Sequence, residues 1–214
     1  MASLPTHARG NLRAQLELFA GADAPKCDRA PSGRILILAP HMDDESFGCG
    51  GTMATAVAMG AKITVVFLTN GNKGYEPERT ANFSSAKVAE FEEALTITRK
   101  QEAQSACSAL GISDFEFLDF PDSALSVSDV SVRRLQEVIL RVKPEDIFLP
   151  FFCDPHPDHI ITNQLLMACI QDSCKAQIRC WGYEIWNPVS ANVIVDITTH
   201  IGEKIRDGFL FKPK

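Results

Sequence analysis

Apolar residues along the chain fall into short continuous runs that alternate with longer segments of helical periodicity. Four runs are rich in Ile, Val, Leu and Phe and are bounded by turn residues, at residues 34–39, 62–68, 114–118 and 146–150. Runs of this kind are typical of strands that are buried on both faces of a parallel sheet. Shorter runs at residues 177–181 and 192–196 predict two more strands.

The segments between the runs predict helices. In residues 130–142, apolar side chains recur at positions i, i+3, i+4 and i+7 and form one helical face, and Pro144 ends the helix. Residues 85–110 form a longer, mostly helical segment that Gly111 ends. Alternating strands and helices with right-handed crossovers predict an α/β fold, a Rossmann-like, doubly wound, mostly parallel sheet in a single three-layer domain.

The first residues of the chain differ from this alternating pattern. We expect residues 1–32 to form an N-terminal extension, with a short helix at 12–19 and a connector rich in Gly and Pro at 21–33. The domain then takes up residues 33–214. One domain fits a length of 214 residues, and 45% hydrophobic and 22% charged residues is an ordinary globular composition.

Charge, apolar length and cysteine use exclude several classes of protein. The net charge of −6 and the lack of a basic stripe disfavour nucleic acid as a partner. The apolar runs span a handful of residues, whereas a bilayer requires about 20, and the N-terminus has no apolar stretch of the signal-peptide kind, so we expect no membrane association. Seven cysteines without a CxxC pair indicate reduced thiols and a cytoplasmic protein.

Two clusters of histidine and aspartate each follow a predicted strand. The first cluster follows the run at 34–39, and the second follows the run at 146–150. In a Rossmann-like strand order, these two strands flank the crevice at the carboxyl ends of the sheet, where such folds bind ligands. We therefore expect the side chains of the two clusters to meet: His41, Asp43, Asp44, His156, Asp158 and His159.

The residue types in these clusters are those of a catalytic metal site. His41 and Asp44 are three residues apart and can face one point, and His156 and His159 have the same spacing. Three ligands of the types His, Asp and His, with a fourth position open to water, are typical of catalytic zinc. Such a metal lowers the pKa of its bound water to about 7. Asp43 is the remaining carboxylate that could accept the proton of that water.

Each cluster also has structural interpretations. Carboxylates are favoured at helix N-termini, so the aspartates could cap the helices that follow. The glycines at 48, 50 and 51 could hold a phosphate, but they lack the G-x-G-x-x-G spacing, which favours close packing of a helix on a strand. Cys49 and Cys153 could bind a soft metal, although buried structural thiols are more common. Asp154 either holds a metal-binding histidine or forms the turn before Pro155.

The two motifs, His41-Met42-Asp43-Asp44-Glu45 and His156-Pro157-Asp158-His159, resemble those of the LmbE/PIG-L family of metal-dependent N-deacetylases. The similarity in order and spacing extends over roughly residues 33–205 and includes the segments at 48–52, 69–74 and 183–198, together with Arg99 and Glu102. Met42 stands where the family usually carries proline, which affects the rigidity of the turn rather than the set of ligands.

The resemblance implies a role for each residue of the two motifs. Asp43 is expected to act as the general base. His156 is expected to act as a general acid or as an electrostatic partner of the oxyanion, oriented by Asp158, with a pKa near or above neutrality. We expect it to lie across the substrate rather than in the shell of the metal. The expected metal ligands are His41, Asp44 and His159.

The resemblance also implies a reaction and a substrate class. The expected reaction is hydrolysis of the acetyl group of an N-acetylated amino sugar of the N-acetylglucosamine type, with Zn²⁺ as cofactor, or Fe²⁺ or another divalent metal. Arg99 and Tyr75 are candidate substrate contacts, although Arg99 could instead pair with Glu102. Tyr75, Trp181 and Trp186 could stack on a sugar or belong to the core or a subunit interface.

Three alternatives stay open at this point. The substrate could be a non-sugar N-acyl compound. The domain could instead be a nucleotide-binding module, or an iron(II) oxygenase that uses a similar donor set, although such oxygenases are usually barrels of antiparallel strands. The sequence also leaves assembly into a homo-oligomer open.

Overall fold

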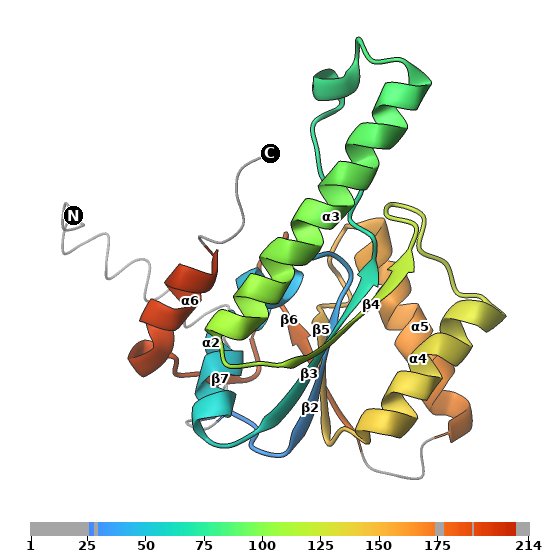
Figure 1. Cartoon of the computed structure of the whole chain (residues 1–214). Helices are drawn as coiled ribbons and strands as arrows, with labels where there is room; N and C mark the ends of the chain where they lie inside the picture. Colours follow the sequence, from blue (N-terminus) through green and yellow to red (C-terminus); the bar gives the residue numbers. More distant parts are fainter. Residues whose placement is uncertain (1–25, 28–29, 174–177, 190, 209–214) are drawn as a thin grey trace.

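The computed structural model describes residues 26–27, 30–173, 178–189 and 191–208 (Figure 1). The short helix expected at 12–19 lies outside the described residues. The centre of the fold is a five-stranded parallel sheet with the strand order β4-β3-β2-β5-β6. Its strands are β2 (Arg34–Ala39), β3 (Lys62–Thr69), β4 (Asp114–Phe120), β5 (Asp146–Pro150) and β6 (Arg179–Tyr183).

The order of the strands determines where the two motifs meet. Strands β3 and β4 lie in order on one side of β2. The chain then returns to the other side of β2, where β5 and β6 follow in order. Strands β2 and β5 are direct neighbours, with Ile35 opposite Asp146 and Ile37 opposite Phe148. The strand order therefore reverses between β2 and β5, and the crevice expected there is confirmed.

Helices cover both faces of the sheet, so the predicted three-layer α/β fold is confirmed (Figure 1). One face carries α2 (Asp44–Ala58), α3 (Ser85–Ala109) and, packed on these two, α6 (Ile201–Gly208). The other face carries α4 (Asp129–Val142) and α5 (Pro157–Ser173). Two short 3₁₀ helices, η1 (Pro77–Thr80) and η2 (Thr198–His200), lie in the connections. None of the described helices is long and apolar enough to span a bilayer.

The predicted helix ends match the local chemistry. Ser84 caps α3 by accepting a hydrogen bond from the backbone N–H of Lys87, and Gly111 follows the helix with a φ of 76°. A capping box formed by Ser128 and Ser131 begins α4. Lys143 ends it in the left-handed region, directly before Pro144. These caps satisfy backbone groups that a helix end would otherwise leave unpaired.

Two of the expected strands are present but differ from the prediction in their partner or their burial. The residues at 192–196 do not extend the main sheet; within them, only β7 (Ile194–Val195) is a strand, and it pairs with β1 (Lys26–Cys27) in a separate two-stranded sheet. So short an apolar alternation does not specify a pairing partner. Burial on both faces holds for β2, β3 and β5, whereas β4 is largely half-buried or exposed because it is an edge strand.

Candidate metal and active site

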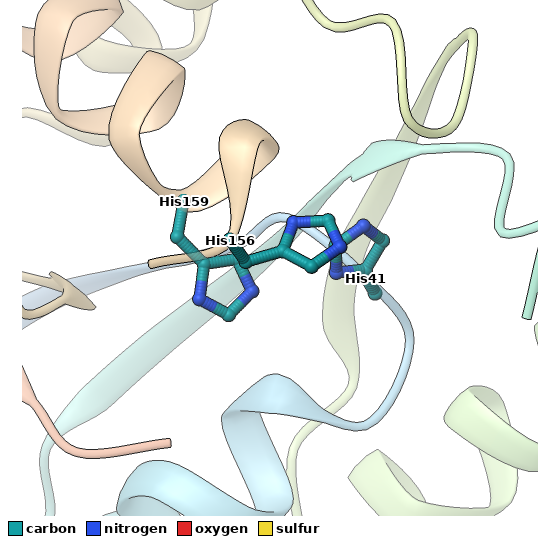
Figure 2. A group of neighbouring side chains, drawn as sticks. All are labelled: His41, His156 and His159. Carbon is teal, nitrogen blue, oxygen red and sulfur yellow. The ribbon is translucent and has the colours of Figure 1, made fainter. Parts of the chain in front are cut away.

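The two predicted clusters lie together at the carboxyl ends of β2 and β5. Figure 2 shows three imidazoles that converge there, His41 from the loop after β2, His156 from the turn before α5 and His159 from the first turn of α5. The ring centroid of His41 is 4.6 Å from that of His156 and 5.4 Å from that of His159. Residues 115 or more positions apart therefore form one site, as the strand order predicts.

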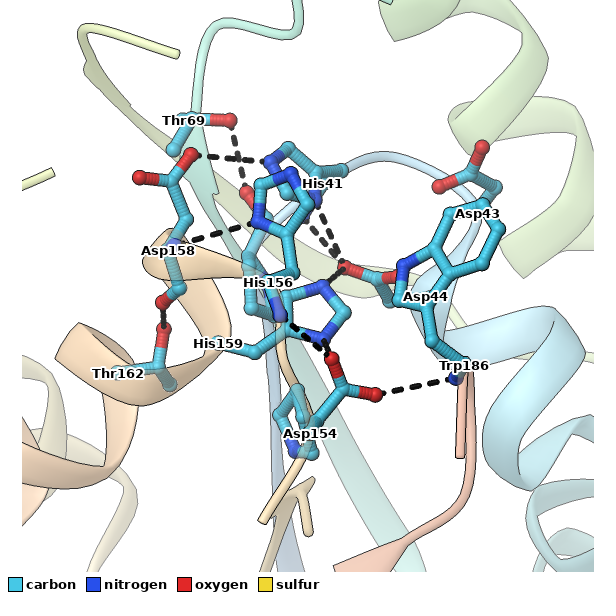
Figure 3. Close-up of polar contacts among 12 residues, drawn as sticks. His41, Asp43, Asp44, Thr69, Asp154, His156, Asp158, His159, Thr162 and Trp186 are labelled. Atoms are coloured by element: carbon cyan, nitrogen blue, oxygen red, sulfur yellow. Dashed lines mark hydrogen bonds and ion pairs between the residues drawn. The ribbon is translucent and has the colours of Figure 1, made fainter. Parts of the chain in front are cut away.

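Asp44 joins the two clusters through one carboxylate oxygen. Its Oδ2 atom lies 3.2 Å from Nδ1 of His41 and 3.3 Å from Nε2 of His159 (Figure 3). The backbone N–H of His41 also donates to this oxygen, at 2.8 Å. Burial raises the pKa of Asp44, but the attraction of the imidazoles of His159 and His41 outweighs burial and lowers the pKa well below its usual range. Asp44 is therefore an ionised carboxylate between two imidazole nitrogens.

Asp158 contacts His41, and not the ring of His156 that it was expected to orient. Its Oδ2 atom is 3.1 Å from Nε2 of His41, and the Oδ1 atom of Asp122 is 3.4 Å from the same nitrogen. Burial lowers the pKa of His41, but the hydrogen bonds with Asp122, Asp158 and Asp44 more than offset burial, so the pKa is raised well above its usual value. The expected role of Asp158 in orienting His156 through its side chain is corrected accordingly.

A strained turn after β4 supplies hydrogen bonds to Asp158. Its carboxylate accepts hydrogen bonds from the backbone N–H groups of Ser123, at 2.8 Å, and Leu125, at 3.1 Å. Ser123 has a φ of 62°, a left-handed backbone conformation that is uncommon for a residue other than glycine. Hydrogen bonds from this turn and from His41 lower the pKa of Asp158 against the effect of burial.

Asp122 belongs to the site, although the sequence reasoning missed it. It is 7% exposed, and it accepts a hydrogen bond from the backbone N–H of Lys73. Burial raises the pKa of Asp122, but the hydrogen bond with His41 and further contacts lower it to about 2. A signal was present, because Asp122 follows the end of β4 and so lies at the same edge of the sheet as the two motifs.

His159 is fully buried among polar partners. Its Nδ1 atom lies 3.0 Å from Oδ1 of Asp154, which supports the interpretation of Asp154 as a residue that holds a histidine. Among the described residues, however, neither ring nitrogen of His159 has a hydrogen-bond partner of good geometry. A buried imidazole is costly without such partners, and it is well suited to bind a cation.

The structure corrects two expectations for His156. Its ring is not set apart, because one nitrogen of each of His41, His156 and His159 lies within 4.8 Å of the others. The reason is that His156 lies in the turn before α5, where its backbone N–H donates to Asp154 at 3.0 Å. In addition, burial and then the positive charges of His41 and His159 lower the pKa of His156, and these effects outweigh the attraction of Asp158.

Asp43 lies beside the cluster and is paired with Arg99. The Nη2 atom of Arg99 is 3.0 Å from Oδ2 of Asp43 and donates to the backbone carbonyl of Met42 at 3.0 Å. Arg99 is 6% exposed, so its side chain does not lie on the helix surface. Asp43 occupies the N-cap position of α2, but its side chain makes no capping hydrogen bond. The capping interpretation therefore does not apply to Asp43.

Tyr75 contacts helix α3. Its hydroxyl donates to Glu92 at 2.7 Å, and its ring packs edge to face on Phe91, with 5.1 Å between the centroids. Lys73 and Asn72 of the same loop also donate to Glu92. These contacts attach the loop after β3 to the end of α3 that extends beyond the sheet in Figure 1.

The glycines at the start of α2 allow close packing, as the sequence favoured. A Cβ atom at Gly48 would lie 2.3 Å from the ring of Tyr183, and one at Gly51 would lie 2.4 Å from Ile197. No disulfide forms among the five cysteines whose side chains the structure describes. Cys49 is buried and Cys153 is exposed.

The arrangement provides overlapping sets of donors for a metal ion. Asp44 is in contact with His41 and with His159, the three histidines form a second set, and His41 with Asp122 and Asp158 forms a third. His41 is common to all three sets. Nitrogen and carboxylate oxygen donors suit zinc and related divalent metals. The cluster is therefore a candidate site for a divalent metal.

A family model described as PIG-L, GlcNAc-PI de-N-acetylase, matches residues 36–170 of the chain. The chain belongs to the PIG-L family. The matched residues of this PIG-L protein include both motifs, which follow β2 and β5. The resemblance seen in the motifs is therefore confirmed at the level of the family.

Similar proteins are known from bacteria. A Bacillus cereus protein named probable N-acetyl-alpha-D-glucosaminyl L-malate deacetylase 2 is 31% identical over 147 residues, covering 67% of this chain and 63% of the relative. A 1D-myo-inositol 2-acetamido-2-deoxy-alpha-D-glucopyranoside deacetylase of Thermomonospora curvata is 33% identical over 153 residues, covering 62% of this chain and 50% of the relative. The PIG-L chain thus matches between half and two thirds of the length of these relatives.

The fold is also that of a solved structure. A conserved protein from Thermus thermophilus has a TM-score of 0.68 and 26% identity, and the match covers 83% of this chain and 77% of that chain. The similarity extends well beyond the two motifs and includes most of the sheet and its helices.

Proposed function

We propose that this PIG-L protein is a metal-dependent hydrolase that removes the acetyl group from an N-acetylated amino sugar of the N-acetylglucosamine type, or from a conjugate of such a sugar. The observation that carries the proposal is the position of Asp44 Oδ2, within 3.3 Å of imidazole nitrogens from both motifs. The names of the two relatives, both deacetylases of glucosamine derivatives, support the substrate class.

His41, Asp44 and His159 are the proposed metal ligands. The buried His159 nitrogens, which lack hydrogen bonds of good geometry among the described residues, fit a metal ion. Asp158 and Asp122 contact His41, and Asp154 contacts His159, so each histidine of the proposed set has a carboxylate to fix the orientation of its ring. The metal would be Zn²⁺, or Fe²⁺ or another divalent ion. When bound, it would lower the pKa of a bound water to about 7 and polarise the acetyl carbonyl.

Asp43 is the proposed general base. Its side chain is 33% exposed, and the ion pair with Arg99 holds it beside the cluster. In the overall reaction, a water oxygen bonds to the acetyl carbon, the carbon–nitrogen bond breaks, and acetate and the amine leave. Asp43 would take a proton from the water and pass it to the departing nitrogen.

His156 is proposed to stabilise the oxyanion as a neutral imidazole. The backbone N–H of Asp158 donates to Nδ1 of His156 at 3.2 Å, so the proton of the neutral ring is on Nε2. The lowered pKa of His156 favours this neutral form. The Nε2–H group could then donate a hydrogen bond to the negative charge that develops on the acetyl oxygen.

Arg99 and Tyr75 remain proposals as substrate contacts. Arg99 borders the partly exposed Asp43 and could reach a sugar hydroxyl there. Tyr75 could contact the substrate from the loop after β3, which also carries Lys73. We place the activity in the cytoplasm, in a chain that could also form a homo-oligomer.

Metal analysis coupled to an acetate-release assay tests the proposal. Purified protein would be assayed on N-acetylglucosamine, N,N'-diacetylchitobiose and an N-acetylglucosaminyl malate, beside a non-sugar N-acetyl compound. We expect stoichiometric metal and release of acetate from at least one of the sugars. The substitution Asp44→Asn should remove the metal and the activity, and Asp43→Asn should keep the metal but reduce turnover about 10²- to 10⁴-fold.

Asp129→Asn is the matched control, since this exposed aspartate in the first turn of α4 takes no part in the contacts described for the site. It should leave both metal and activity unchanged. A metal-free protein, or an Asp43→Asn variant as active as the natural chain, would contradict the proposal. Stabilisation by nucleotides without any metal would instead support a nucleotide-binding module.

A further inference from the structure

Trp186 is a large aromatic side chain that is exposed beside the histidine cluster. It is 66% exposed and lies in the segment that follows β6. In the view of Figure 3, its indole lies on the same side of the histidines as Asp43 and Asp44, whereas Asp158 lies on the other side. A tryptophan buries a large apolar area when it is covered, so an exposed one next to a reaction site is suited to contact a ligand.

One carboxylate attaches this segment to the proposed metal site. Oδ2 of Asp154 accepts a hydrogen bond from the backbone N–H of Trp186 at 3.0 Å. Oδ1 of the same residue accepts the backbone N–H of His156 and lies 3.0 Å from Nδ1 of His159. Asp154 is itself 3% exposed. The backbone of Trp186 is therefore held in a fixed place relative to both histidines of the second motif.

Two further hydrogen bonds hold the segment around Trp186. The side-chain amide of Asn187 donates to the carbonyl of Cys153 at 3.4 Å, and the backbone N–H of Val189 donates to Glu184 at 3.1 Å. The first of these bonds attaches the segment again to the turn that carries Asp154 and His156. The exposed indole thus belongs to a segment that several hydrogen bonds hold in place.

The other tryptophan of the chain has a different environment. Trp181 is half-buried, its indole N–H donates to Asp146 at 2.7 Å, and its ring stacks on Phe148. Within the described part of the chain, no hydrogen bond or ring contact of this kind involves the indole of Trp186. Trp181 has a structural role, whereas the indole of Trp186 is available to a ligand.

We propose that Trp186 is the aromatic platform on which the pyranose ring of the substrate packs. The inference rests on the proposed function and names a residue that determines its specificity. A hexopyranose in its chair form has a face of C–H groups, and this face can cover an indole while the hydroxyl groups at the ring edge remain hydrogen-bonded. The acetamido group would then point toward the histidines, since Asp154 holds the platform beside them.

Tryptophan fluorescence tests the contact directly, because the chain has two tryptophans. In a Trp181→Phe variant, the emission comes from Trp186 alone, and it would be titrated with N-acetylglucosamine and with N,N'-diacetylchitobiose. We expect a saturable change in intensity or wavelength. The same titration of Trp186→Phe should give no change. If Trp181→Phe does not fold, the difference between the natural chain and Trp186→Phe gives the same signal.

Steady-state kinetics test the role of the platform. Trp186→Ala should raise KM for the sugar about tenfold and leave kcat within about twofold. Trp186→Phe keeps an aromatic face and should recover most of the lost affinity. A fall in kcat with an unchanged KM would overturn the inference, as would an alanine variant with the kinetics of the natural chain.

The outcomes separate this inference from the proposed function. If the natural chain releases acetate but the Trp186 emission does not respond to sugar, the platform is wrong and the deacetylase stands. If sugar changes the Trp186 emission in a saturable way but no acetate is released, the platform stands and the deacetylase is wrong.

Discussion

Oδ2 of Asp158 lies 3.1 Å from Nε2 of His41, and these two residues are 117 positions apart in the chain. The contact joins the motif after β5 to the motif after β2. Because an imidazole that binds a metal is usually held by a hydrogen bond at its other nitrogen, Asp158 is placed to fix the orientation of His41. The aspartate of the second motif thus acts on the histidine of the first.

The substitution Asp158→Asn should weaken metal binding. It preserves the size of the side chain but removes the charge that faces His41, and loss of such a partner typically costs 10- to 100-fold in metal affinity. Competition with a chelator of known affinity measures the change. Asp129→Asn should bind metal as the natural chain does. An Asp158→Asn protein with unchanged affinity would show that His41 is held by other groups.

Metal binding should release a proton at neutral pH. The pKa of His41 is raised well above its usual value by its three carboxylate neighbours, so the imidazole is protonated at pH 7, and it must lose this proton to bind a metal. The protonated form stabilises the metal-free fold fully below pH about 6.5, and this contribution is lost as the pH rises through the raised pKa. Metal affinity should therefore increase with pH over the same interval.

Calorimetric titration with Zn²⁺ at pH 7, in two buffers of different ionisation enthalpy, counts the released protons. If His41 is a ligand, it should release about one proton per metal, in addition to the fraction of a proton that a metal-bound water with a pKa of about 7 releases. Equal heats in the two buffers would mean that no proton leaves, and His41 would then not be the ligand.

Asp122 should contribute to the stability of the metal-free protein in a pH-dependent way. Its pKa is lowered to about 2 in the fold, against about 3.9 in an unfolded chain. The resulting stabilisation of about 2 kcal/mol is present above pH about 4 and is lost as the pH falls through about 2. The free energy of unfolding of Asp122→Asn should thus be lower at pH 7, and the difference should shrink in acid.

Urea unfolding in the presence of a chelator, from pH 7 to pH 3, measures this difference. Glu137→Gln is the control, since this exposed glutamate lies in the interior of α4, away from the helix ends, and it should follow the natural chain at every pH. A difference for Asp122→Asn that stays constant with pH would rule out a role for the carboxylate charge.

Gly74 should be intolerant of alanine because of Arg99. A Cβ atom at position 74 would lie 1.9 Å from Nη1 of Arg99, the guanidinium of which holds Asp43 and the carbonyl of Met42. Displacement of the guanidinium would release Asp43, and kcat/KM should fall on the order of 10- to 100-fold. Gly202→Ala is the matched control, since nothing lies within 4 Å of its added Cβ atom. Equal activity of both variants would show that Asp43 does not depend on Arg99.

Much of the fold could be predicted from the sequence. The strands β2 and β5 have the predicted bounds, because each is a short apolar run between turn residues. Their adjacency follows from the general order of doubly wound sheets, and it brings His41 and His159 together. Separate partners such as β1 and β7 could not be predicted, since two residues carry too little pattern.

The contacts within the site were harder to predict. Motif spacing places His156 near α5, but the direction of its ring depends on the turn that Asp154 closes, and this turn has no periodic pattern. Asp122 is a single aspartate outside both motifs; its place after β4 puts it at the same edge of the sheet, but no pattern in the sequence indicates that it contacts His41. The partner of Asp158 likewise depends on the turn at Ser123, where an uncommon backbone conformation brings an N–H group to the carboxylate.

The position of both motifs after the two central strands has a consequence for how the site is lost. Strands β2 and β5 are hydrogen-bonded to each other and flanked by β3 and β6. They therefore cannot separate unless the hydrogen bonds in the middle of the sheet break. The amides of such strands exchange with deuterium mainly when the whole domain opens. The two halves of the site should therefore stay together up to the denaturant concentration at which the entire domain melts.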